Sequence, residues 1–194
     1  MRYVINLLLI VIIGLLGFMV YNSIKDPIKF GEEKELRKSA VVGELEEIRK
    51  AQEIFRSITG HFAPTFDSLV YVLKNDSIPF TKIIGDPDDK DNADKFQKIV
   101  TYSSAYDSIQ AMGIDLDKLG TIPYTDNMKF EMDADTVEYQ KTNVAVVEVG
   151  TKWKNFMGEF ADPKYRKYDS KYNPETTIKF GDMNKPSLSG SWNR

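Results

Sequence analysis

The feature that most constrains this chain is an unbroken apolar run near its amino end. Residues 4–21 read VINLLLIVIIGLLGFMVY, and Asn6 is their only strongly polar side chain. A helix of this length rises about 27 Å, close to the hydrocarbon thickness of a bilayer. Lipid offers no hydrogen-bond partners, so the backbone of such a run must be helical. The run predicts a membrane anchor whose lipid-facing side chains include Leu7, Leu8, Leu9, Ile12, Ile13, Leu15, Leu16 and Phe18.

Two other interpretations of this run fit less well. A cleaved signal peptide has an apolar region of about 7–15 residues followed by small residues at the cut. Here the run is longer, and the segment YNSIK that ends it lacks such a site. A buried core helix would need a polar face, which the run does not have. We therefore expect an uncleaved signal anchor over residues 1–24.

Charges flanking the run bear on its orientation. Arg2 precedes it, whereas five basic residues follow it, and a simple count would place the carboxyl-terminal side in the cytoplasm. Long domains cross largely regardless of charge, however, and acidic residues are interleaved with these basic ones. We expect a single-pass protein of the inner membrane with its carboxyl-terminal domain in the periplasm. The basic residues concerned are Lys25, Lys29, Lys34, Arg37 and Lys38.

Composition limits the remainder to one ordinary domain, over residues 32–194. The chain has 194 residues, 42% of them hydrophobic, and a net charge of −3. This small acidic excess gives no reason to expect nucleic acid as a partner. Cysteine is absent, which excludes disulfides, thiolate metal sites and a cysteine nucleophile.

Pro27 should end the membrane helix, because proline removes a helical hydrogen bond. We expect a hinge over residues 25–31 and then an amphipathic helix over 32–59, with Gln52 filling a gap in its apolar stripe. Thr65 can cap a shorter second helix. The stripe of the long helix consists of Leu36, Val41, Leu45, Ile48, Phe55 and Ile58, and continues to Phe62.

The last third alternates polar and apolar residues, which is typical of strands. We expect a three-stranded meander over residues 129–149 with turns at Asp133–Asp135 and Lys141–Asn143, and a last strand at 176–180. A further strand is expected at 99–102, a polar loop at 162–174, and residues 109–119 fit either helix or coil. Helices followed by antiparallel strands predict an α+β fold, with the helices packed on one small antiparallel sheet.

An anchored amino end, an amphipathic helix, the turn Gly60-His61-Phe62 and a small sheet together resemble type IV pilin-like proteins and pseudopilins. Residues 42–52, 66–69, 122–125, 181–183 and 190–192 are similar to an uncharacterised family of single-pass envelope proteins of Gram-negative bacteria. The chain departs from pilins because Gly17-Phe18-Met19-Val20 lies inside the apolar run, with no acidic residue at the fifth position. The resemblance therefore implies a shape and a placement, and no activity.

No residue pattern indicates catalysis, a metal or a cofactor. His61, the only histidine, lacks a nucleophile motif such as G-x-S-x-G and is more typical of a helix-ending turn. The acidic stretch 86–94 could offer oxygen ligands to calcium, but it lacks the glycine and glutamate of an EF-hand loop, so we expect a solvated loop. Phosphate-binding glycine motifs are also missing.

Aromatic and basic residues alternate near the carboxyl end, a composition enriched at protein interfaces. We predict a partner-binding surface that includes Trp153, Tyr165, Tyr168, Tyr172 and Trp192. The alternative is that some of these rings belong to the core. The first functional hypothesis is a non-catalytic, membrane-anchored subunit of an envelope or secretion assembly, contacting the bilayer and envelope proteins. The second is a tethered module that binds an envelope glycan or peptide, and an enzyme ranks last.

Overall fold

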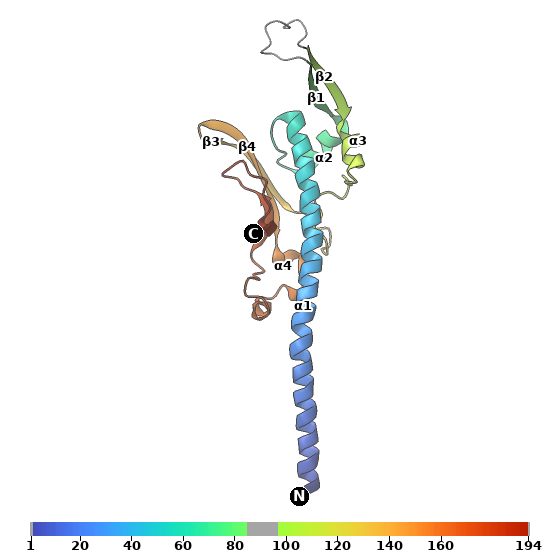
Figure 1. Cartoon of the computed structure of the whole chain (residues 1–194), viewed down its shortest axis with the longest axis vertical. Helices are drawn as coiled ribbons and strands as arrows, with labels where there is room; N and C mark the ends of the chain where they lie inside the picture. The colour runs from blue at the N-terminus through green and yellow to red at the C-terminus, as the bar shows by residue number, and fades with distance from the viewer. Residues whose placement is uncertain (1, 85–96, 194) are drawn as a thin grey trace.

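A computed structural model describes residues 2–84 and 97–193 of the chain. Its largest element is the helix α1 (Arg2–Thr59), which has 58 residues and rises about 87 Å. Figure 1 shows that the amino-terminal half of α1 stands clear of the other elements, while its carboxyl-terminal half runs through the folded domain. Among the side chains of α1 that the structure describes, the first buried one is that of Phe30.

The bare half of α1 is the expected apolar segment. An 18-residue window there has a mean hydropathy of 2.7, and none of it is buried within the structure. The eight predicted anchor side chains, Leu7 to Phe18, are all exposed. By length and composition this helix can therefore cross a membrane.

The hinge expected at residues 25–31 is wrong, because α1 continues through Pro27 without interruption. Proline deprives the carbonyl of Ser23 of its helical partner. Ser23 lies two residues beyond the apolar run, at a depth where water can reach that carbonyl. One turn further on, Phe30 is only 2% exposed, so packing against the domain holds the next turn in helical geometry.

The apolar stripe of α1 is largely the core face that its spacing predicts. Val41, Leu45 and Ile48 are fully buried. Leu36 is the exception, since it is 55% exposed and not part of the core. Phe30 packs against the domain instead. Each helical residue rotates by about 100°, so Leu36, six residues later, points about 120° away from Phe30.

A buried glutamine fixes the turn that follows α1. The Gln52 side chain donates to the Ala63 carbonyl at 3.0 Å and accepts from the Ala63 amide at 2.9 Å. Gly60 ends the helix with a φ of 83°, a conformation that favours glycine. Thr65 then caps α2 (Phe66–Asn75) through the Ser68 amide, as expected.

Two separate sheets replace the single expected one. β1 (Ser77–Ile84) pairs with β2 (Gln97–Ser104) as an antiparallel ribbon, followed by α3 (Ala105–Ala111). The strand expected at 99–102 lies inside β2, while β1 was not expected. In Figure 1 the ribbon and the second sheet lie on either side of the domain end of α1.

The second sheet has the order β3-β4-β5, with β3 (Glu131–Tyr139), β4 (Thr142–Lys152) and β5 (Thr177–Gly181) all antiparallel. The meander expected over 129–149 is wrong, because Asp133–Asp135 lies inside β3. The other expected turn, at Lys141–Asn143, lies beside the observed one at Gln140 and Lys141, whose φ angles are 50° and 66°. Two successive positive φ angles are typical of a tight hairpin turn. Helix and antiparallel strand thus coexist as the α+β class predicts.

Between β4 and β5 the chain folds back to α1. This connection holds α4 (Trp153–Phe156) and two short 3₁₀ helices, η2 (Gly158–Phe160) and η3 (Pro163–Lys167). The loop expected at 162–174 is therefore partly helical. A last 3₁₀ turn, η4 (Ser191–Asn193), ends the described chain beside β5.

Candidate functional site

Five aromatic rings join α1 to the connection between β4 and β5, and we call this group the aromatic clasp. Its centre is Phe30, whose ring centroid lies 5.1–6.1 Å from the centroids of the four others. The Tyr165 ring stacks on Phe30 at an interplanar angle of 7°. Aromatic pairs at such separations contribute about 0.5–1.5 kcal/mol each beyond their burial. The clasp consists of Phe30, Phe160, Tyr165, Tyr168 and Tyr172.

Two ion pairs flank the clasp and also link α1 to the connection between β4 and β5. Lys29 Nζ lies 2.7 Å from a Glu159 carboxylate oxygen, and Lys34 Nζ lies 2.7 Å from one of Asp169. The hydrogen bond from Lys34 holds the pKa of the Asp169 carboxyl below its ordinary value of 3.8. Arg37 adds a bond of 2.7 Å from its guanidinium to the Phe156 carbonyl. The domain is thus fastened to α1 over its first turns beyond the apolar segment.

The structure places the five predicted partner-binding residues in one region, but not all of their side chains are exposed to solvent. Tyr172 is only 3% exposed, and its hydroxyl donates to the Phe160 carbonyl at 2.7 Å. Burial raises the pKa of Tyr172 to about 12. Tyr172 is therefore a core residue, and its assignment to a partner-binding surface is wrong. The reason is that Phe30, which we had placed in a hinge, offers it an apolar neighbour.

The other four predicted residues are half-buried. Tyr165 and Tyr168 belong to the clasp and cover Phe30 with one side of their rings. Trp153 contacts Tyr172 at a centroid separation of 5.9 Å. Trp192 lies at the end of the chain, outside the clasp. Their exposed parts remain available for contact, and that part of the prediction stays a prediction.

A cavity of about 250 Å³ opens beside the clasp. Its walls come from α1, from the connection around Asp169–Thr176, and from the end of the chain. Both tryptophans of the sequence, Trp153 and Trp192, line this cavity. Three lysines line it as well: Lys34, Lys38 and Lys171. No spacing pattern in the sequence could have joined these residues, because they lie on four separate parts of the chain, at 34–38, 153, 171 and 192.

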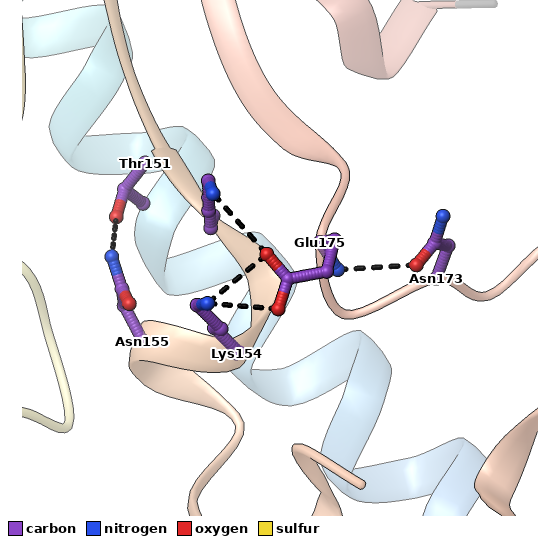
Figure 2. Close-up of polar contacts among 6 residues, drawn as sticks. Thr151, Lys154, Asn155, Asn173 and Glu175 are labelled. Atoms are coloured by element: carbon purple, nitrogen blue, oxygen red, sulfur yellow. Dashed lines mark hydrogen bonds and ion pairs between the residues drawn. The ribbon is translucent and has the colours of Figure 1, made fainter. Parts of the chain in front are cut away.

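A charged cluster supports the wall next to Trp153. Figure 2 shows the Glu175 carboxylate accepting hydrogen bonds from Lys154. Lys152 also donates to Glu175, at 3.2 Å. Both hydrogen bonds lower the pKa of the Glu175 carboxyl, and the bond from Lys154 has the larger effect. Trp153 lies between the two lysines in the sequence, so the cluster fixes the backbone that carries the indole.

The remaining candidate residues show no chemistry of their own. His61 is exposed, and its Nδ1 lies 3.1 Å from the Thr59 carbonyl oxygen in the turn after α1. The acidic stretch 86–94 considered for calcium lies outside the described residues. Among residues 2–84 and 97–193, no group of three or more histidine or acidic side chains is placed to hold a metal ion.

Comparison of the chain with protein-family models, with curated proteins and with solved structures gave no match in any of the three. The geometry of the anchor, the clasp and the cavity is therefore the basis for any functional assignment.

Proposed function

We propose that this protein is a membrane-anchored, non-catalytic interaction subunit of a bacterial envelope or secretion assembly, with the organisation of a pseudopilin. Its span lies in the inner membrane and its domain in the periplasm. The observation that carries this proposal is that one unbroken helix, α1, contains the apolar segment and also contributes a buried stripe to the core of the domain.

Continuity of α1 controls where the domain sits. Phe30 comes nine residues after Tyr21, so the clasp begins about 13 Å beyond the end of the apolar run. The clasp and its ion pairs tie the domain to α1 at this height. A domain held near the bilayer meets other membrane proteins at a raised effective concentration. This arrangement favours a role that depends on position and contact.

The division of α1 into a bare half and a covered half supports the pseudopilin comparison. Side chains from Tyr3 to Ile28 leave a long apolar surface exposed, which needs lipid or another apolar helix to cover it. Leu36 extends this surface beyond the span, on a side of α1 that the domain leaves open. We propose that Ile28 and Leu36 contact a membrane-bound partner.

Crosslinking tests this function in the intact chain. A photoreactive residue replacing Leu36 should capture a defined membrane protein, and mild detergent extraction should recover the same protein in a fixed ratio. The control places the residue at Lys118, whose side chain is 84% exposed and lies in the domain. Recovery of the free monomer alone, with no product specific to Leu36, would contradict the proposal.

The compartment can be measured separately, because the chain has no cysteine. A single cysteine replacing Lys118 should react with a membrane-impermeant maleimide added to intact spheroplasts. A cysteine replacing Arg2, on the other side of the span, should react only after lysis. The opposite pattern of labelling would place the domain in the cytoplasm.

A further inference from the structure

We infer that the cavity beside the aromatic clasp binds one residue of an anionic oligosaccharide, such as a uronic acid. This inference goes beyond the assembly proposal and does not depend on it. It rests on the size, charge and position of the cavity and on the two indole rings in its wall.

The size of the cavity limits what it can hold. Its volume of about 250 Å³ is below the roughly 300–1,000 Å³ of pockets that enclose drug-sized molecules. It therefore fits one ring-sized group with the rest of the ligand outside. A sugar unit within a longer glycan has this form.

The lining combines cations with neutral polar groups. Three lysines and one carboxylate, Asp169, border the cavity. Asp169 is already engaged by Lys34 at 2.7 Å and by the Lys171 amide at 2.9 Å. Glu35 lies 3.6 Å from Lys34 and 3.8 Å from Lys38, but it is 63% exposed, so both pairs are weak. Three lysines against the carboxylates of Asp169 and Glu35 leave an excess of one positive charge, which favours an anionic ligand.

Two indole rings favour a sugar over a simple anion. The C–H faces of a pyranose pack against flat aromatic rings, while the indole N–H can meet a hydroxyl. Neutral partners for further hydroxyls are present at Asn173, Thr176 and Ser191. An anion without an apolar face would gain nothing from Trp153 and Trp192.

The tryptophan at the end of the chain is held in place by several contacts. Gly190 is buried, and a side chain there would overlap the Trp192 ring. Gly190 bridges to Phe180, and the Lys179 amide donates to the Ser191 hydroxyl at 3.0 Å. The tail is thus seated on β5 so that its indole forms one wall of the cavity.

The distance of the cavity from the bilayer favours a glycan over a lipid headgroup as its ligand. Lys34 comes thirteen residues after Tyr21, or about 20 Å along α1. A helix tilt of about 40° would still leave it about 15 Å above the hydrocarbon. Headgroups occupy only about 5–8 Å there, so lipids of the anchoring bilayer do not reach the cavity.

The test uses the full chain in uncharged detergent micelles and a trisaccharide of galacturonic acid as the probe. Both tryptophans line the cavity, so binding should change the intrinsic tryptophan emission. Calorimetry should show about tenfold weaker binding for Trp192→Ala and for Lys171→Ala. Lys118→Ala removes a lysine far from the cavity in the sequence and should bind as the wild type does. Melting temperature confirms that each variant is folded.

Several outcomes would overturn this inference. They are absence of binding, equal binding of the neutral galactose trisaccharide, equal binding of triglutamate, or equal weakening by Lys118→Ala. A change of tryptophan emission in nanodiscs on adding anionic lipid alone would assign the cavity to headgroups instead. Any of these results would leave the crosslinking at Leu36 as a separate question.

Discussion

Replacing Phe30 by alanine is the sharpest perturbation of this structure, because Phe30 is the centre of the clasp between α1 and the connection that follows β4. Phe30 is 2% exposed, so the change forfeits nearly all the transfer energy of a phenylalanine, about 1.5–3 kcal/mol. It also leaves a cavity among the four other rings of the clasp, which all lie on the connection between β4 and β5. Together these effects predict a loss of about 3–5 kcal/mol in the free energy of unfolding.

The matched control is Leu36→Ala on the same helix. Leu36 occupies the apolar stripe in the sequence but is 55% exposed, so its truncation should change the unfolding free energy by about 0.5 kcal/mol or less. Urea denaturation in micelles, followed by the fluorescence of Trp153 and Trp192, measures both variants. Trypsin adds a local readout, because Phe30→Ala should speed cleavage after Lys164, Arg166 or Lys167. Equal losses for the two variants, with unchanged cleavage, would refute the clasp.

Three further changes test other parts of the fold. Gln52→Leu should cost about 2–4 kcal/mol in urea denaturation, because it leaves the amide and carbonyl of Ala63 unpaired; a loss below about 1 kcal/mol would count against that pairing. The lowered pKa of Asp169 means that its contribution to stability is complete above its ordinary pKa and disappears as pH falls through the folded value. Melting temperatures between about pH 6 and about pH 3 should therefore fall less steeply for Asp169→Asn than for the wild type, and parallel curves would disprove this. Gly181→Ala should destabilise by at least about 1–3 kcal/mol, because φ is 88° there, whereas Gly43→Ala, in open space on α1, should stabilise slightly.

Local signals in the sequence were sufficient where one property decides the outcome. The apolar run is long enough to be a helix whatever surrounds it, and α1 includes all of it. The spacing of Val41, Leu45 and Ile48 predicts a buried face, and these residues are fully buried. Thr65 before an apolar segment predicts a helix cap, which the structure confirms.

Predictions failed where a distant segment outweighs a local preference. Pro27 is a helix breaker in isolation, but its cost falls on a carbonyl that water can reach, and the packing of Phe30 favours the next helical turn. Leu36 fits the stripe by spacing, yet the domain docks on the other side of α1. Asp133–Asp135 lie inside β3 because β3 pairs with β4 over its whole length, from Glu131 to Tyr139. No local pattern contains these contacts.

The candidate site shows the same limit more strongly. Composition alone indicated that the aromatic residues after β4 form a surface, but it could not divide them between core and solvent. That division depends on Phe30, which lies about 140 positions away from Tyr172 in the chain. Trp192 was predicted on the same grounds, yet its pairing with Trp153 across a cavity requires the tail to fold back on β5.

Continuity of α1 bears on both proposals at once. A hinge at Pro27 would let the domain lie on the headgroups, where anionic lipids would compete for the lysines of the cavity. An unbroken helix instead keeps Lys34 and Lys38 beyond the headgroup layer and keeps Leu36 beside whatever spans the membrane next to α1. Tilting of the helix would move the domain and the cavity together, and a tilt of about 40° would still keep the cavity above the headgroups. The crosslinking at Leu36 and the binding of the trisaccharide therefore test two proposals that share one element, α1, and either can fail without the other.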